Sequence, residues 1–311
     1  MAGAVVIVTY NSAAEIGSCL DAVAHYAPEW QVVVVDNRSN DQTVSHVKQR
    51  NGVILIENQE NLGFAAGVNQ GIRFLPGADP ILLLNPDARL KTGLDLMTAD
   101  CRQHGLASGK LVDSSGAAQA GFTVRRLPTA VALVFESLGI NKLWPSNPVN
   151  RRYRCLDLDL NQPAFVEQPA GALLMFRRDV WEKLGGLDER FHPVWFEDVD
   201  FCKRALDAGN RISFNPAVTV EHDGGGSVGQ MPIGNRAVFW YVSLLRYAAK
   251  HFTMLSFRTV CAAVVIGSIP RIVAGGIRER SLQSVRAYGK VIWVSVRSFF
   301  QADVSEASPA R

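Results

Sequence analysis

The sequence predicts an α/β fold in which helices cover both faces of a mostly parallel sheet, followed by a C-terminal basic helical extension. Three observations support this prediction. Short apolar runs alternate with amphipathic segments through the first third of the chain, which is typical of parallel strands joined by helices. Hydrophobic residues make up 48% of the 311 residues, enough for a sizeable core. Polar residues also follow successive apolar runs directly, and such sheets bind ligands beyond the carboxyl ends of their strands.

In the first third we expect buried strands at 4–8, 31–35, 53–56, 81–84 and 106–111. Helices are expected between them, at 12–24, 39–50, 65–74 and 92–104. Ser12 with Glu15, and Ser39 with Gln42, fit the capping-box pattern at a helix start. Thr92 is the expected cap of the fourth helix.

In the rest of the chain, a turn at Asp113–Gly116 is followed by an irregular segment, 122–163. An apolar strand at 171–176 and a Gly185-Gly186 turn lead to a helix that begins at Glu197 and ends at Gly209. That helix is expected to bury Val199, Cys202, Ala205 and Leu206. We then expect strands at 211–215 and 217–220, a mobile loop at 224–227, and helices at 237–252, 258–277 and 281–300.

This pattern divides the chain into a catalytic domain, a helical segment and a tail. The domain is expected at 1–235, with halves 1–112 and 113–235, the helical segment at 236–300 and a disordered tail at 301–311. Between Arg236 and Arg297 there are ten basic residues and a single acid, Glu279. The total net charge of only +3 gives no reason to expect a nucleic-acid partner.

Cysteine usage and the N-terminus bear on the compartment. The five cysteines are scattered without a CxxC pair, as expected for free thiols in a reducing compartment. No charged region precedes the first apolar run, so we expect no signal peptide and a cytoplasmic protein. The late apolar run 260–269 is shorter than a membrane span and stops at Pro270.

Glu197 and Asp198 are the strongest candidates for catalysis. They stand in the first turn of the expected helix, where backbone N–H groups favour negative charge. A carboxylate fixed there can take a proton from a substrate hydroxyl. The alternative is that the two acids only cap the helix.

Two further residues suggest a metal site. Asp87, in Asn85-Pro86-Asp87 at the end of a strand, is a hard oxygen ligand suited to Mg²⁺ or Mn²⁺. His222 follows a later strand and is a candidate neutral ligand. The alternatives are an Asx-Pro turn and an ordinary loop histidine.

A nucleotide is the expected ligand of the first half. Asp36, at the end of the second strand, could accept hydrogen bonds from a base or a ribose, or could cap the turn that follows. Gly63 stands at a helix start, where the backbone can approach a phosphate closely. Neither GxGxxG nor GxxxxGK[ST] occurs, which disfavours a dinucleotide site or a P-loop.

Taken in order, the motifs resemble those of family 2 glycosyltransferases, with bacterial rhamnosyltransferase-like enzymes as the closest branch. The resemblance covers about residues 4–230. It rests on TYNS (9–12), VDNRSNDQT (35–43), ENLGFAAGVNQGI (60–72), LLLNPDARL (82–90), PAGALLMFRRDVWEKLGGLDERF (169–191), EDVDFCKRALDAG (197–209) and EHDGGGS (221–227).

The resemblance implies a Rossmann-like GT-A fold, a nucleoside-diphosphate sugar donor, a divalent cation (Mn²⁺ or Mg²⁺) and inversion at the anomeric carbon. It implies that Asp198 is the catalytic base, beside Glu197, and that Asp87 and His222 hold the cation. The donor nucleotide would bind Thr9, Asn11, Asp36, Asn61, Gly63, Asn69 and Asn85. Asn85 replaces the first acid of the family's DxD metal motif, which favours either weaker cation binding or a requirement for donor phosphates to complete the shell.

The acceptor is expected to be a hydroxyl of a saccharide or of a polyprenyl-linked saccharide in cell-surface polysaccharide synthesis, with rhamnose a candidate sugar. The basic segment 236–300 suggests peripheral contact with the inner face of the cell membrane; packing on the catalytic domain is the alternative. Two other functions stay open. One is a non-catalytic nucleotide-sugar-binding partner. The other is a nucleotidyltransferase, disfavoured because TYNSAAE lacks a glycine-rich phosphate loop.

Overall fold

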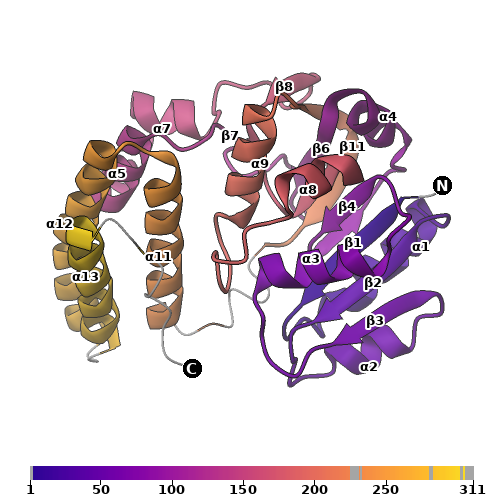
Figure 1. Cartoon of the computed structure of the whole chain (residues 1–311), viewed down its shortest axis with the longest axis horizontal. Helices are drawn as coiled ribbons and strands as arrows, with labels where there is room; N and C mark the ends of the chain where they lie inside the picture. The colour runs from indigo at the N-terminus through magenta and orange to yellow at the C-terminus, as the bar shows by residue number, and fades with distance from the viewer. Residues whose placement is uncertain (1–2, 225–230, 232, 280–282, 302–303, 305–311) are drawn as a thin grey trace. The chain divides into compact units, whose positions relative to one another are not determined.

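The computed structural model describes residues 3–224, 231, 233–279, 283–301 and 304. The chain forms two compact units (Figure 1). Unit 1 comprises residues 1–127, 154–189 and 197–229, and unit 2 comprises residues 128–153, 190–196 and 230–311. Residues 225–227 of the loop expected at 224–227 and most of the expected tail lie outside the described residues.

Unit 1 is built on a nine-stranded sheet, counted over the described residues, in the order β3-β2-β1-β4-β10-β6-β11-β5, with β8 also pairing with β11. Six strands run in one direction, as the parallel pairs and the antiparallel position of β10 between β4 and β6 require. The expectation of a mostly parallel sheet is therefore confirmed. The strands are β1 (Ala4–Thr9), β2 (Gln31–Asp36), β3 (Val53–Glu57), β4 (Ile81–Leu84), β5 (Ala88–Leu90), β6 (Gly105–Val112), β8 (Ala164–Val166), β10 (Leu173–Phe176) and β11 (Arg211–His222).

The strand predictions need one correction. The two strands expected at 211–215 and 217–220 are a single strand, β11, with an irregularity in its pairing to β6 between Asn215 and Thr219. A separate two-stranded sheet pairs β7 (Val124–Arg125) with β9 (Gln168–Pro169).

Helices cover both faces of the sheet in unit 1. One face packs against α1 (Ile16–Tyr26), α2 (Thr43–Lys48) and α4 (Asp95–His104) through side chains such as Ile7 and Val34. The other packs against α3 (Phe64–Phe74), α8 (Arg178–Leu184) and α9 (Glu197–Asp207) through Val6, Val33 and Phe176. Alternate residues of β1 face opposite cores, as a strand buried on both sides requires.

Two of the predicted helix caps, Ser39 and Thr92, are wrong. α1 begins at Ile16 and α2 at Thr43, and neither N-cap side chain makes a capping hydrogen bond. Ser39 instead bonds the Asp36 carboxylate with both its backbone N–H and its hydroxyl, at 2.8 and 2.6 Å. α4 begins at Asp95, and the Thr92 hydroxyl accepts a hydrogen bond from the Thr219 backbone N–H. These side chains join separate segments rather than cap helices.

The region around α8 and α9 agrees better with prediction. Gly185 and Gly186 both have positive φ, 73° and 83°, and form the turn after α8. α9 begins at Glu197, and Gly209, with φ of 84°, follows its end. Its buried face contains Val199, Cys202 and Ala205 as predicted, whereas Leu206 is only partly buried.

Unit 2 is helical within the described residues and contains α5 (Ala130–Leu138), α6 (Ile140–Leu143), α7 (Pro148–Tyr153), α11 (Ile233–His251), α12 (Met254–Glu279) and α13 (Gln283–Gln301). The segment expected to be irregular therefore supplies three short helices. α12 continues through Pro270, and its Met254–Gly275 stretch is long and apolar enough to cross a membrane. The prediction from the run 260–269, that this apolar segment is shorter than a membrane span, is therefore corrected.

Candidate functional site

The ends of β1 and β2 form a hydrogen-bonded group in unit 1. Thr9 and Asp36 are opposite each other in the parallel register, and the buried Thr9 hydroxyl donates to the Asp36 carboxylate at 2.8 Å. Ser39 supplies the two further bonds described above. The carboxylate is therefore oriented by three donors: Oδ1 accepts two of the bonds and Oδ2 accepts one, so Oδ2 keeps further acceptor capacity.

Asn11, Asn61 and Gly63 shape the loops beside these strand ends. Asn11 has a positive φ of 52°, and its side-chain oxygen accepts from the Asn40 N–H at 2.8 Å. The Asn61 side-chain oxygen accepts from the Gly63 N–H at 2.9 Å, immediately before α3. Gly63 has φ of 86°, a conformation that favours glycine. The two loops thus have fixed backbones near the ends of the parallel strands.

Asn69 does not join this group. Its buried side chain accepts from Trp181 Nε1–H and the Leu187 N–H, and donates to the Leu187 carbonyl and to Glu189. These four bonds use the full capacity of an amide. The structure therefore gives Asn69 a role in fixing the α8 turn to α3, and we leave it out of the nucleotide site.

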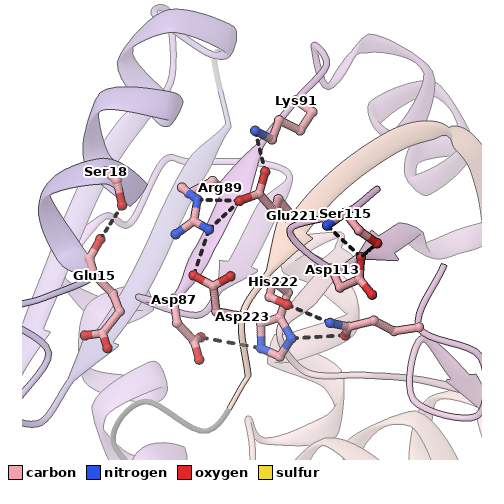
Figure 2. A network of polar contacts seen from close by, with 11 residues as sticks. Glu15, Ser18, Asp87, Arg89, Lys91, Asp113, Ser115, Glu221, His222 and Asp223 are labelled. Atoms are coloured by element: carbon pink, nitrogen blue, oxygen red, sulfur yellow. Dashed lines mark hydrogen bonds and ion pairs between the residues drawn. The ribbon is translucent and has the colours of Figure 1, made fainter. Parts of the chain in front are cut away.

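Asp87 and His222 are brought together by the pairing of β11 with β5, in which His222 is opposite Ala88. Both side chains are buried, at 9% exposure for Asp87 and 3% for His222, and His222 Nε2 lies 3.4 Å from Asp87 Oδ1. Figure 2 shows the imidazole directed at the carboxylate. Its other nitrogen, Nδ1, lies 3.3 Å from Gln119 Oε1.

The charged side chains near Asp87 are mainly acidic, and Arg89 lies among them. Burial, and then the charge of Asp87, raise the pKa of the Glu15 carboxyl. Arg89 bridges Glu221 and Asp223 at 2.5 and 2.7 Å (Figure 2), and these bonds raise its pKa. Arg89 is thus held by its own partners, and Asp87 faces His222.

Asp198 lies at the same edge of the sheet as Asn85. The Asn85 N–H donates to the Ala172 carbonyl at 3.1 Å, and the preceding residue, Gly171, donates its N–H to Asp198 Oδ2 at 2.9 Å. The Asp198 carboxylate also accepts from the Val199 N–H. Two hydrogen bonds and one peptide unit therefore connect the Asn85-Pro86-Asp87 segment to the predicted base.

The two acids at the start of α9 differ in their surroundings. Burial raises the pKa of Asp198, while the N–H groups of Gly171 and Val199 and the charge of Arg125 oppose this rise. Burial, and then the charge of Asp198, raise the pKa of Glu197 well above its ordinary value. Glu197 Oε2 is buried with no hydrogen-bond partner. Asp198 is thus a carboxylate held by two backbone N–H groups, and Glu197 is a buried acid whose charged form is disfavoured.

Several residues of this region carry no sequence signal that we recognised. Gly171 is one: a Cβ there would lie 3.0 Å from Asp198 Oδ2, so a larger residue would displace the carboxylate. Arg125 belongs to the segment expected to be irregular, 122–163, and Gln119 lies between that segment and the expected turn at 113–116; His222 and Asp198, which they meet, are distant in sequence. The motif PAG could have indicated a close backbone approach at Gly171.

The mostly parallel sheet with acids at its strand ends is the arrangement expected for a glycosyltransferase with a GT-A fold. Comparisons with known proteins agree with this expectation. Residues 4–96 match the family model "Glycosyl transferase family 2". Over 235 residues the chain is 29% identical to N-acetylglucosaminyl-diphospho-decaprenol L-rhamnosyltransferase of Mycobacterium tuberculosis, covering 71% of this chain and 75% of that protein. Residues 4–96 therefore carry a family 2 glycosyltransferase domain, and the chain is similar to a rhamnosyltransferase over 235 residues.

Solved structures support the fold. GalNAc-T7 with UDP, GalNAc and Mn²⁺ matches with a TM-score of 0.55 at 16% identity, over 80% of this chain and 50% of that one. The mannosyltransferase PcManGT of Pyrobaculum calidifontis, with GDP-Man and Mn²⁺, matches with a TM-score of 0.52 at 18% identity, over 98% and 84% of the two chains. At these identities the likeness concerns the fold.

Proposed function

We propose that the protein transfers a sugar, with rhamnose the first candidate, from a nucleoside-diphosphate donor to a hydroxyl of a polyprenyl-linked saccharide, with inversion at the anomeric carbon. The observation that carries the proposal is the connection of Asp198 to the Asn85-Pro86-Asp87 segment through Gly171 and Ala172. The mycobacterial relative is named for a decaprenol-linked acceptor and for L-rhamnose, and this supports the proposed substrate class.

In this proposal Asp198 removes the proton from the acceptor hydroxyl, whose oxygen attacks the anomeric carbon as the diphosphate leaves in a single displacement. The raised pKa of Asp198 makes it a stronger base than an ordinary aspartate. Two backbone N–H groups keep its carboxylate oriented. Thr9, Asn11 and Asp36 would bind the nucleotide, and the loop of Asn61 and Gly63 would approach the phosphates.

A divalent cation fits Asp87 and His222. When the His222 imidazole is neutral with its proton on Nδ1, the lone pair of Nε2 faces Asp87 Oδ1, 3.4 Å away. A cation bound by both atoms would satisfy these two electron-pair donors. Within the described residues no group of three or more His, Cys, Asp or Glu side chains could hold a metal. Donor phosphates and water would complete the shell. When bound, the cation supplies positive charge to the departing diphosphate.

A thermal-shift screen tests the donor and the cation together. We expect stabilisation by one of the dTDP-, UDP- or GDP-sugars, larger with Mn²⁺ than without. Incubation of that donor with a polyprenyl-diphosphate saccharide should then release nucleoside diphosphate and invert the anomeric configuration. Binding without turnover would favour the non-catalytic partner, and release of pyrophosphate would favour a nucleotidyltransferase.

Peripheral contact with the inner face of the cell membrane is the second part of the proposal. α12 and α13 are antiparallel, since Arg258 near the start of α12 bonds the carbonyl of Phe299 near the end of α13. Their exposed apolar residues include Leu255, Ile266, Ile269, Val273, Trp293, Val296 and Phe300. The two helices contain one acid, Glu279, and several Arg and Lys residues, so an anionic lipid surface is complementary to them.

Contact along the surface is favoured over a span because Arg271, within α12, donates to the carbonyls of Ser137 and Glu136 in α5. Flotation with vesicles containing anionic phospholipid tests this. The wild-type chain should float, and Trp293→Ser combined with Phe300→Ser should not. Leu143→Ser, at an exposed residue of α6, is the matched control. Equal flotation of all three proteins, or no flotation of the wild type, would contradict the membrane contact.

A further inference from the structure

The imidazole of His222 is held from two sides by a segment that follows β6. Gln119 Nε2 donates to the His222 backbone carbonyl at 2.6 Å, and Gln119 Oε1 lies 3.3 Å from His222 Nδ1. The Phe122 ring stacks on the imidazole, with centroids 5.2 Å apart and planes 11° apart. Three interactions from one short segment therefore fix a single histidine.

The hydrogen bond to the carbonyl determines which way the Gln119 amide faces. A carbonyl only accepts, so the amide nitrogen must face it, and the amide oxygen must face Nδ1. An amide oxygen also only accepts, so Nδ1 must carry a proton. In the neutral imidazole the lone pair is then on Nε2, the nitrogen that faces Asp87 at 3.4 Å.

The backbone of Gln119 is itself fixed. Its N–H donates to the Leu111 carbonyl at 3.0 Å, and its own carbonyl accepts from the N–H groups of Phe122 and Thr123. The residue before it, Ala118, forms an antiparallel bridge with Val112. The amide is thus presented to His222 from a rigid turn that continues β6.

We propose that Gln119 is a positioning residue that holds His222 in the Nδ1-protonated tautomer and so directs the Nε2 lone pair to the point shared with Asp87. Ligating histidines usually donate their second ring N–H to a neighbouring group, and loss of that group typically weakens metal binding 10–100-fold. Gln119 supplies such a partner. The cation part of this inference rests on the proposed function, whereas the tautomer part does not.

The tautomer is measured by the ring ¹⁵N shifts of the full chain labelled with ¹⁵N-histidine, free of metal and nucleotide. His222 is assigned as the signal missing from His222→Asn. We expect Nδ1–H in the wild type and loss of that preference in Gln119→Leu, which removes both amide bonds at similar volume. His46, whose Nδ1 lies 2.9 Å from the Ala13 carbonyl, is an internal reference that should not change.

Two other variants separate the amide from general loosening. Phe122→Leu removes the stacked ring and keeps the amide, so His222 should remain Nδ1-protonated. Gln31→Leu, at an exposed position on β2, should change nothing. An unchanged tautomer in Gln119→Leu, or its loss in both Gln119→Leu and Phe122→Leu, would overturn the inference.

Mn²⁺ affinity, measured by electron paramagnetic resonance with saturating nucleoside diphosphate, tests the consequence. Gln119→Leu should bind Mn²⁺ about 10–100-fold more weakly than the wild type, and Gln31→Leu should match the wild type. A changed tautomer with wild-type Mn²⁺ affinity would overturn the positioning role. If the wild type binds no Mn²⁺ in the presence of UDP, GDP or dTDP, the proposed cation site is refuted. The tautomer measurement would still test the role of Gln119 in that case.

Discussion

Glu197 is expected to reduce stability at neutral pH, and replacing it should show this directly. Its carboxyl is buried, lacks a partner for Oε2 and has a pKa raised well above the ordinary value. Between the unfolded pKa, about 4.3, and the raised folded pKa, the folded state binds more protons than the unfolded state. The stability of the wild type therefore falls as pH rises through this window, by at most about 1.4 kcal/mol per pH unit.

Glu197→Gln keeps the shape of the side chain and removes its ionisation. Below about pH 4 the variant and the wild type should have matching free energies of unfolding. As pH rises further the variant should become more stable than the wild type, and the difference should stop growing at the folded pKa of Glu197. For a unit of 150–250 residues each kcal/mol corresponds to about 2–4 °C in Tm. Thermal unfolding between pH 4 and 8 measures the gain, with the exposed Glu29→Gln as control. A gain independent of pH would refute the reasoning.

Two further predictions concern the surroundings of Asp198. Gly171→Ala should lower kcat about 10–100-fold, because its Cβ would meet Asp198 Oδ2 at 3.0 Å and displace the base. Gly93→Ala, whose Cβ would meet nothing closer than 3.9 Å, is its control, and equal activity of the two variants would contradict the steric argument. Arg125→Gln should move the acidic limb of the pH profile of kcat/KM to higher pH, because the Arg125 charge lowers the pKa of Asp198. A shift to lower pH would show that Arg125 acts differently.

The strand ends were predictable from sequence because each apolar run stops at a polar residue. Val32–Val35 is followed by Asp36, and Ile81–Leu84 by Asn85. Parallel strands bring such ends to one edge, and the Thr9–Asp36 bond follows from that register. The direction of β10 was not predictable, because a short strand that is buried on both faces has the same apolar pattern whether it runs parallel or antiparallel.

The supporting residues were not predictable for a different reason. Asn69 meets Leu187, 118 residues away, and Gln119 meets His222, 103 residues away. An amide in a helix or a loop has the same local pattern whether it binds a ligand or another segment. Ser39 resembled a helix cap for the same reason, since hydroxyls bond any nearby group, and the Asp36 carboxylate is the stronger acceptor.

The central claim is that the Asp198 carboxylate takes the acceptor proton, and Asp198→Asn tests it most directly. The amide has the same shape but is a poor base, so single-turnover transfer with the identified donor and acceptor should fall about 10²–10⁴-fold. Nucleotide affinity, measured by calorimetry with Mn²⁺ present, should stay at the wild-type value. Transfer at a near wild-type rate would contradict the account.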